Sequence, residues 1–449
     1  MKPVFLYSDL LFFALLIFTA ALIFFQRKNP NFVHVKNLLK TNATAISSAT
    51  ILSAFLFIAV LDSIHFRPAI DDEHYSVNVL SVLDLATANL RQNLEKSYSA
   101  PFATRLLTLE TVENEKGELT RAAPRLQFGG AHLKNESEKS ADIARLSAKF
   151  LILGIAIIFA IFLLYKITAA AIFQKKFAFT VENRAFWVTF SLIVLGAVFL
   201  GGFSFYYHPL GTDKVGQDVL YQILKSVRVA VLIGLLTTFI LLPLAVFLGI
   251  VAGYFRGLAD DAIQYAYTVL NAVPSVLLIA AAILMMQVLI DSHPAWFESA
   301  LERADLRFLA LCAILGITSW TTLCRLLRAE TLKLSQMEYV KAARAFGASH
   351  ARILWGHILP NLSHIIIISV VMDFSTLVLA EAVLSYVGIG VDPMMMSFGT
   401  LINNARLELG RDPVVWWLLA SAFFAMLLLV LSANLFADAL RQALNPREI

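Results

Sequence analysis

The sequence predicts an all-α protein that crosses a membrane about nine times. Of its 449 residues, 59% are hydrophobic and only 15% are charged, and the mean hydropathy is +0.73. Soluble domains carry about 25% charged residues, so this composition is that of a membrane protein. Long apolar runs recur along the chain, and a helix needs about 20 such residues to cross the hydrocarbon layer with its backbone hydrogen bonds satisfied internally.

The apolar runs place nine expected spans. They lie near residues 5–25, 45–62, 149–170, 185–205, 229–252, 264–290, 308–327, 362–388 and 414–436. The first run has no small-residue cleavage site and is followed by Gln26-Arg27-Lys28, a stop-transfer pattern. We therefore expect it to be a retained span and not a cleaved secretion signal.

The charges of the short loops predict the side of the membrane on which each loop lies. Basic residues outnumber acidic ones in 27–40, 166–184 and 324–360, which is typical of cytoplasmic loops. The loop 291–307 holds more acidic than basic residues and suits the outside. Alternating the spans through these assignments puts the N-terminus outside and the C-terminus in the cytoplasm. The net charge of only +4 gives no reason to expect nucleic acid as a partner.

A polar insert, 63–148, separates the second and third expected spans and should lie outside the membrane. We expect a small α+β or partly irregular structure. Residues 75–97 carry apolar side chains at roughly helical spacing, which predicts a helix there. Residues 104–128 have the pattern of a hairpin that turns at Asn114-Glu115-Lys116-Gly117, and the charged stretch 129–142 is expected to be a loop.

The segment 338–361, between the seventh and eighth expected spans, predicts two short helices in the cytoplasm. Tyr339 to Phe346 is an alanine-rich helix, Gly347 ends it, and a second amphipathic stretch runs from Ser349 to Pro360. The small alanine side chains would let the first helix sit closely in a groove of a partner. An ordinary amphipathic loop at the membrane surface is the alternative.

This segment resembles the signature loop of ATP-binding-cassette importers, which reads Glu-Ala-Ala, three residues, Gly, nine residues, Ile, any residue, Leu-Pro. The positions in register are Ala342-Ala343, Gly347 and Leu359-Pro360. Lys341 replaces the usual glutamate, and His357 replaces the usual isoleucine. The resemblance implies a coupling helix that docks on a separate ATPase subunit. The coupling residues that it implies are Tyr339, Lys341, Ala342, Ala343, Arg344, Phe346, Gly347, Ala348, Leu359 and Pro360.

The sequence predicts a transporter subunit with no chemistry of its own. It contains no Gly-x-x-x-x-Gly-Lys-[Ser/Thr] loop, so ATP and magnesium are expected on the partner ATPase subunits and no cofactor on this chain. The nine histidines show no metal-binding spacing. Cys312 and Cys324 are twelve residues apart on one expected helix, about 18 Å, which is too far for a disulfide.

A second motif resembles the C-type subunit of dipeptide and oligopeptide permeases. It is His208-Pro209-Leu210-Gly211-Thr212-Asp213, followed by Gly216 and Asp218, and further matches include Ala380-Glu381-Ala382 and Leu384 to Gly388. This resemblance covers roughly 206–449. It implies that the outer, periplasmic mouth includes His208, Gly211, Thr212, Asp213 and Asp218.

The resemblance also divides the chain. Residues 1–62 would form two additional transmembrane helices, 63–148 a periplasmic insert, 149–184 a third additional helix with a cytoplasmic linker, and 185–449 the permease core of a type I importer. Such a subunit belongs in the bacterial inner membrane. Its implied partners are a related permease subunit in a heterodimer, two ATPase subunits, a periplasmic binding protein and membrane lipid.

Isolated polar residues in the apolar runs suggest a pathway or gate. An unpaired charge costs about 2.5–3.5 kcal/mol at the centre of a span, so Asp373 and Glu381 should face the pore, a partner subunit or an arginine. The full candidate set is Pro274, Ser275, Asp373, Glu381, Ser385 and Gly388. Structural pairing of the acids and a simple kink at Pro274 are the alternatives. Gly249 and Gly253 predict close helix packing.

The resemblance implies import by alternating access, with di- or oligopeptides as the expected cargo. The same importer class with nickel, glutathione, oligosaccharide or another small solute as cargo remains an alternative. A second alternative is an ATP-independent channel or a receptor that senses a ligand through 63–148, against which the glycine-centred loop argues. A membrane enzyme would need a nucleophile and base or a metal motif, and the sequence contains none.

Overall fold

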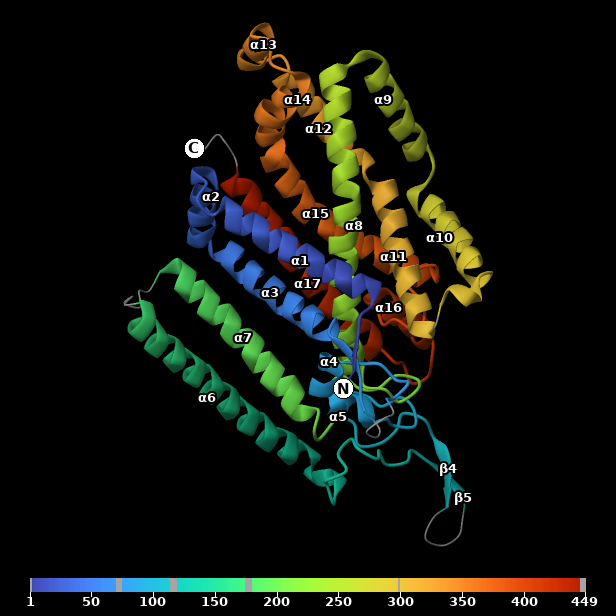
Figure 1. Cartoon of the computed structure of the whole chain (residues 1–449). Coiled ribbons are helices and arrows are strands. Elements are labelled where there is room, and N and C mark those ends of the chain that lie inside the picture. Colours follow the sequence, from blue (N-terminus) through green and yellow to red (C-terminus); the bar gives the residue numbers. More distant parts are fainter. Residues whose placement is uncertain (1, 70–74, 114–118, 174–179, 298, 445–449) are drawn as a thin grey trace. The chain divides into compact units, whose positions relative to one another are not determined.

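The computed structural model describes residues 2–69, 75–113, 119–173, 180–297 and 299–444. Two compact units form in these ranges. The first contains Lys36–Val229 and Met396–Leu435 together with the N-terminal strand, and the second contains Phe5–Val35, Ala230–Met395 and the chain from Phe436 onward. Both are built mainly from long apolar helices (Figure 1).

Three of the four long helices of the first unit lie side by side, with α7 packed against both α3 and α6 (Figure 1). They are α3 (Ala43–Asp62), α6 (Lys139–Phe173) and α7 (Val181–Phe203), and α2 (Pro30–Thr41) precedes them. Lys40 at the end of α2 pairs with Glu182 at the start of α7 at 2.9 Å. This contact joins two of the segments predicted to be cytoplasmic.

The α6 helix begins earlier than the sequence predicts. The 3₁₀ turn Glu136–Glu138 and the first turn of α6 occupy the end of the stretch 129–142, so the prediction of a loop is wrong there. A helix of 35 residues is about 52 Å long, well beyond a hydrocarbon layer of about 30 Å. Its charged first turns therefore continue the helix outside the hydrocarbon, where charge is no obstacle.

The insert contains two small antiparallel sheets. The first has the order β1-β2-β3 and the second is the hairpin β4-β5. Their strands are β1 (Lys2–Val4), β2 (His65–Arg67), β3 (Leu80–Ser81), β4 (Glu110–Glu113) and β5 (Leu119–Ala122). Pairing of Glu110 with Ala122 confirms the predicted hairpin, and its predicted turn, 114–117, lies outside the described residues.

The continuous helix predicted over 75–97 is wrong. The structure has only two single-turn helices there, α4 (Val82–Ala86) and α5 (Ala88–Gln92), because β3 pairs with β2 just before them and Thr87 leaves the helical conformation between them. Leu83 and Leu90 are buried, whereas Val77 is 89% exposed. The apolar spacing therefore reflected separate contacts and not one helical face.

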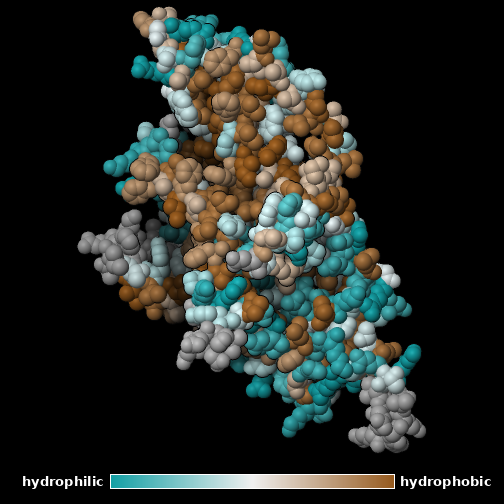
Figure 2. Space-filling model, turned by 45° about the vertical axis from the view of Figure 1, so that its right-hand side comes forward, coloured by the Kyte–Doolittle hydropathy of each residue, from teal (hydrophilic) through white to brown (hydrophobic). Residues whose placement is uncertain are grey.

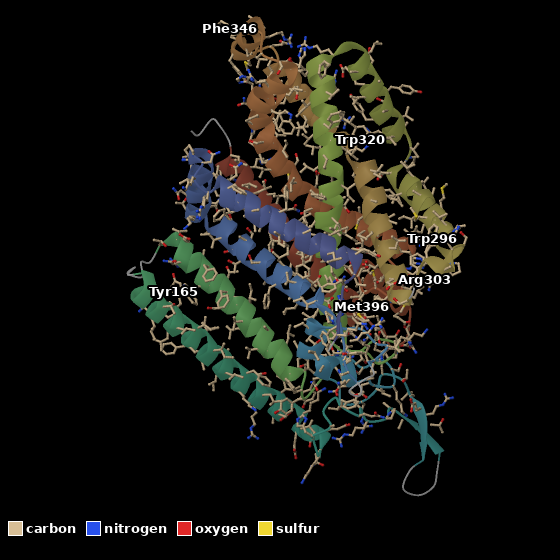
Figure 3. The ribbon with its side chains drawn as sticks, viewed as in Figure 1. Tyr165, Trp296, Arg303, Trp320, Phe346 and Met396 are labelled. Carbon is tan, nitrogen blue, oxygen red and sulfur yellow. The ribbon has the colours of Figure 1, made fainter. Side chains whose placement is uncertain are left out.

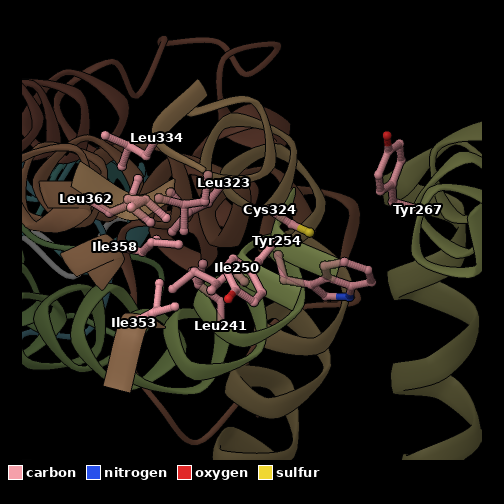
Figure 4. Packing of buried hydrophobic residues seen from close by; sticks show 14 of the residues in the cluster. Leu241, Ile250, Tyr254, Tyr267, Leu323, Cys324, Leu334, Ile353, Ile358 and Leu362 are labelled. Carbon is pink, nitrogen blue, oxygen red and sulfur yellow. The ribbon is translucent and has the colours of Figure 1, made fainter. Parts of the chain in front are cut away.

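The second unit is a helical bundle around a buried apolar cluster (Figure 4). It contains α1 (Tyr7–Gln26), α9 (Gly257–Ala272), α10 (Ser275–Asp291), α11 (Ala300–Ser319), α12 (Thr321–Leu334) and α15 (Leu359–Val387). Most of α8 (Val219–Phe255) also belongs to it. Cys312 and Cys324 are buried free thiols, as predicted, but they lie on two consecutive helices, α11 and α12, and not on one.

The predicted span 264–290 is not one helix. It breaks at Val273-Pro274 into α9 and α10, which meet at an angle of 88°. Proline has no N–H to continue the helix and forces the residue before it into an extended conformation, as Val273 shows with a ψ of 131°. The described residues hold eight helices that could cross a membrane, or nine if this bent pair counts as one span.

The two ends of the second unit carry the segments that the charge pattern assigned to opposite sides. At one end Arg256, after α8, donates to Ser335, after α12, at 3.0 Å. At the other end the Ser8 amide donates to Asp305 at 3.1 Å, which places the start of α1 beside the start of α11. Hydrophilic residues cover the end that bears α13, at the top of Figure 2, and the helix surface below it is largely hydrophobic.

Helix α8 approaches α12 closely at its glycines, as predicted. A Cβ on Gly253 would lie 2.6 Å from Thr331 Cβ and 2.7 Å from the Arg328 carbonyl oxygen. The backbone oxygen cannot move without shifting α12. The bare glycine surface is thus what allows the two helices to touch.

Replacing Gly253 by alanine should therefore lower the stability of the protein by about 1–3 kcal/mol, because the added methyl group overpacks the contact. The matched control is Gly196→Ala on α7, where a Cβ meets nothing within 4 Å and alanine should be neutral or slightly stabilising. Unfolding of the purified protein in a denaturing detergent measures both. Equal stability of the two variants would contradict the close contact.

Candidate coupling elbow and outer contact

Residues 338–360 form a bent element, called the elbow here. Helix α13 (Glu338–Ala345) ends at Gly347, whose φ is +79°. The Ala348 amide donates to the Ala343 carbonyl and the Gly347 amide to the Arg344 carbonyl, each at 3.0 Å. This is the Schellman arrangement, which needs a left-handed residue and so favours glycine. The predicted helix, glycine turn and second helix are confirmed.

The second arm of the elbow runs directly into a membrane span. Ser349 accepts a hydrogen bond from the Arg352 amide and starts α14 (His350–Ile353). A π-helical segment, Leu354–Ile358, follows and leads without interruption into α15. Pro360 is the second residue of α15 and follows the π-helical segment directly. A displacement of the elbow would thus act directly on α15.

The inner face of the elbow is fixed in the buried cluster of the second unit (Figure 4). Val340 is 1% exposed, and Ile353 and Ile358 are fully buried. They pack in one cluster with Tyr254 of α8 and Leu334 of α12. Ala343, Ala348 and Leu359 pack against it as well.

Polar and ring contacts reinforce this attachment. The Tyr254 hydroxyl and His350 Nδ1 are 2.9 Å apart, and the Arg344 guanidinium lies 5.3 Å from the centre of the Tyr254 ring. Arginine over an aromatic face is attracted by the ring's electron density. The end of α8 therefore contacts both arms of the elbow.

The outer face of the elbow is open and mixed in character. Phe346 is 91% exposed and lies at the tip, away from the bundle (Figure 3). The other exposed coupling candidates are Tyr339, Lys341, Ala342, Arg344, Gly347 and Pro360. A large aromatic side chain held in water next to small and basic residues is typical of a surface that contacts another protein.

The five residues predicted at the outer mouth lie in the loop between α7 and α8, and two of them, His208 and Thr212, bond to the insert. His208 is 4% exposed and connects two acids, with Nδ1 2.8 Å from Asp218 Oδ2 and Nε2 3.4 Å from Glu95 Oε1. Asp218 also accepts from the Leu220 amide and so caps the start of α8. Glu95 belongs to the insert, and no motif or spacing predicted its role.

Glu95 is the centre of this polar contact. Its carboxylate accepts hydrogen bonds from the amides of Gln127, Phe128 and Gly129 at 2.9–3.1 Å. Burial alone would raise its pKa, but the hydrogen bonds from His208 and these amides outweigh burial and lower the pKa to about 2. Burial likewise would lower the pKa of His208, but its bonds to Asp218 and Glu95 raise it to about 9. The contact is therefore an ion pair at neutral pH.

Thr212 and Gly211 join the same loop to two other segments. The Thr212 hydroxyl donates to the Ser97 carbonyl at 2.9 Å and accepts from the Ser99 amide at 2.7 Å. Its carbonyl accepts from the indole of Trp417 at 3.0 Å. Gly211 has a φ of +75°, and a Cβ there would lie 2.5 Å from the Ser99 carbonyl oxygen. Only glycine fits this close approach.

Asp213 shapes the loop itself. Its carboxylate accepts from the amides of Val215 and Gln217 and from the side chain of Gln222. Burial raises the pKa of Asp213 in spite of these bonds. His208, Thr212 and Asp218 are buried, so the structure places most of the predicted outer-mouth set inside the contact with the insert and not on an open surface.

The insert is also held by the start of α8 and by the segment after α16 (Phe398–Glu408). Lys225 of α8 pairs with Asp62 at 2.6 Å and with Asp84 at 3.1 Å. At the other side, the guanidinium of Arg411 lies 5.0 Å from the ring centre of Tyr98, which is 1% exposed. Lys225 and Arg411 are far apart in sequence from the residues that they contact. The only sequence signal for these contacts is that Asp62 and Asp84 are isolated acids beside an apolar run.

Comparison with known proteins gives matches to about half of the chain. The profile of the family described as "Binding-protein-dependent transport system inner membrane component" matches residues 245–449. The oligopeptide transport system permease protein OppC of Mycobacterium bovis is 35% identical over 239 residues, which are 53% of this chain and 76% of that protein. The chain belongs to this family.

Two further relatives of the permease have related names. The glutathione transport system permease protein GsiD of Pectobacterium atrosepticum is 32% identical over 240 residues, or 54% of this chain and 73% of that protein. The di/tripeptide transport system permease protein DppC of Pseudomonas aeruginosa is 30% identical over 238 residues, or 53% and 72%. The permease is a multi-pass transport subunit with the all-α architecture that the sequence predicts.

The predicted pathway residues of the permease lie at three places in the second unit. Pro274 and Ser275 form the bend between α9 and α10. Glu381 is 1% exposed in α15 and accepts from the Ser385 hydroxyl at 2.6 Å, and Gly388 ends that helix with a φ of +88°. Asp373 is half-buried two turns earlier in α15. A role of these residues in transport stays a prediction.

Among the described residues, no group of three or more His, Cys, Asp or Glu side chains could hold a metal ion. The acids of the outer contact are each directed at a histidine, a lysine or backbone amides. These polar contacts are therefore suited to holding the insert against the loop between α7 and α8 and against the start of α8.

The pKa shifts predict that attachment of the insert depends on pH. His208 titrates at about 9 here against an ordinary 6.5, so its contribution is complete below pH 6.5 and is lost as the pH rises through about 9. Glu95 titrates at about 2 against 4.5, so its contribution is complete above pH 4.5 and is lost as the pH falls through about 2. Attachment should be strongest between pH 4.5 and 6.5.

Hydrogen exchange of the amides of residues 127–129, corrected for intrinsic rates, measures this attachment. The wild-type protein should lose protection between pH 6.5 and 9.5, and His208→Gln should show weaker protection at pH 6 and little further loss. His132→Gln is the control, because that ring contacts Asp142 instead. The same alkaline loss in His208→Gln as in wild type would show that His208 does not carry the effect.

Proposed function

We propose that this permease subunit serves an ATP-driven, binding-protein-dependent importer whose cargo is di- or oligopeptides. The support for the cargo is that the relatives are named for oligopeptides, for di- and tripeptides, and for glutathione, which is itself a tripeptide. The support for the mechanism is the elbow, with an exposed tip and a buried inner face.

The elbow is proposed as the coupling element. Its tip, with Phe346 and the small side chain of Ala342, would dock in a cleft of an ATPase subunit. Its inner face is packed tightly against α8 and α12, and closely packed side chains transmit displacement because interiors are hardly compressible. Closure of the ATPase subunits on ATP would thus move α15 and its neighbours together and expose the pathway alternately to each side.

The other partners follow from the same proposal. ATP and magnesium would bind to the ATPase subunits, since the sequence holds no phosphate-binding loop. A related permease subunit would complete the pathway as the second half of a heterodimer. A periplasmic binding protein would deliver the peptide to the outer mouth, and the elbow end of the second unit would face the cytoplasm of a bacterial inner membrane.

The insert is proposed to hold the outer mouth in shape. It contacts the loop between α7 and α8 through Glu95 and Ser99, and the segment after α16 through Tyr98. Because most of these contacts are buried and polar, removing one partner leaves an unpaired buried group, which costs more than the bond contributes. Docking of the binding protein would then take place on a preformed surface.

Removal of the Phe346 ring tests the coupling proposal. Buried aromatic anchors contribute about 2 kcal/mol or more to protein interfaces, so Phe346→Ala should weaken binding of the ATPase subunit about 30-fold or more and reduce uptake accordingly. The control is Phe205→Ala, another largely exposed phenylalanine, at 70%, in the loop after α7. Wild-type uptake and co-purification in Phe346→Ala would refute a docking role for the tip.

Uptake of labelled substrates tests the cargo. Cells that carry the complete transporter should accumulate labelled di-, tri- or oligopeptides, with uptake abolished when the ATPase is inactivated. Unlabelled peptides should compete and nickel ions should not. Competition by nickel alone would support the metal-importing alternative, and peptide flux that continues without ATP hydrolysis would support the channel alternative.

A further inference from the structure

A groove runs between α6 and α7, the two antiparallel helices packed side by side in the first unit (Figure 1). Its volume is about 460 Å³. The residues that line it are Ile158 and Phe162 of α6 and Asn183, Arg184, Trp187, Val188 and Ser191 of α7. Both helices precede the residues that the family profile matches.

The body of the groove is apolar and rigidly built. Trp187 packs edge-on against Phe162 at 5.0 Å and against Tyr165 at 5.5 Å between ring centres. Tyr165 lies on α6 toward its C-terminal end (Figure 3). Aromatic side chains in such edge-to-face contact have few alternative positions, so the groove is a preformed feature. Ile158, Phe162, Trp187 and Val188 give it an apolar wall that suits a hydrocarbon group.

One end of the groove is positively charged. Arg184 is exposed at this end and has no ion-pair partner among the described residues. Lys166, one turn beyond Phe162 on the same helix, holds its ammonium 5.6 Å from the centre of that ring. The nearest acid in the sequence, Glu182, is already paired with Lys40 at 2.9 Å. Two cations thus remain for a ligand.

The position of the groove along the helices selects the ligand. Both helices are long and apolar enough to cross a membrane. Lys166 lies beyond the groove on α6, eight residues or about 12 Å from Ile158 inside it, and this length is close to the depth of one leaflet, about 15 Å. The charged end adjoins the segment 166–184, whose basic residues predict the cytoplasmic side.

We propose that this groove binds one anionic phospholipid of the cytoplasmic leaflet. Its phosphate would be held by Arg184 and Lys166, and one acyl chain would lie along Phe162, Trp187 and Val188. Basic pockets between spans at the cytoplasmic surface bind acidic headgroups, and that surface carries a negative potential from its lipids. The bound lipid would fasten α6 to α7 at that end.

Native mass spectrometry of the purified full-length protein tests the site. Phosphatidylglycerol and phosphatidylcholine with identical acyl chains are titrated separately. We expect one phosphatidylglycerol molecule to bind at least tenfold more tightly than phosphatidylcholine. Arg184→Gln and Lys166→Gln should each weaken phosphatidylglycerol binding about fivefold, because each removes one cation near the headgroup. Binding of phosphatidylcholine should not change.

Two further variants separate the site from general effects. Lys149→Gln removes a cation from the opposite end of α6 and should leave binding unchanged. Ser191→Phe fills the groove without changing the charge and should also abolish tight binding, which keeps the test open if Arg184→Gln does not fold. Equal binding of the two lipids, wild-type affinity in the Arg184 and Lys166 variants, or a polypeptide found in the groove would each overturn the proposal.

Discussion

Backbone amides and carbonyls inside a bilayer have no water to bind, and this constraint organises the whole structure. Every described strand lies in the insert or at the N-terminus, and the long helices carry the apolar sequence. The sharp break at Val273-Pro274 occurs where proline has no amide to leave unpaired and where the Pro274 carbonyl accepts from the amides of Leu277 and Leu278.

The polar contacts gather at the ends of the helices, and they differ between the two units. In the second unit an apolar cluster anchors the elbow, with Tyr254 and His350 as its polar margin. In the first unit the insert is held by charges and buried hydrogen bonds around His208 and Lys225. The elbow is thus held mainly by close apolar packing, whereas the insert is held by buried ion pairs that demand their geometry.

Structure that depends on neighbouring residues could be predicted from the sequence, whereas contacts between distant residues could not. The elbow could be predicted because Gly347 and its alanines act within ten residues, and the hairpin because β4 and β5 adjoin each other. The bend at Pro274 was hidden in an unbroken apolar run, and the start of α6 looked like a loop because its first turns are charged. Glu95 and His208 are 113 residues apart, and no periodicity connects them.

The pairing of β1 with β2 in the small sheet constrains how the chain crosses the membrane. Strand β1 pairs with β2, with Lys2 opposite Arg67, so both must end on the same side of the bilayer. The stretch between them contains α1 and α3, and it must therefore leave and return, an even number of crossings. Strand β1 therefore cannot pair with β2 until α3 has crossed back to the same side of the membrane. The N-terminal region must insert both crossings before its sheet can form. A fusion that kept the first residues on the other side of the membrane would leave the edge of β2 that β1 covers unpaired.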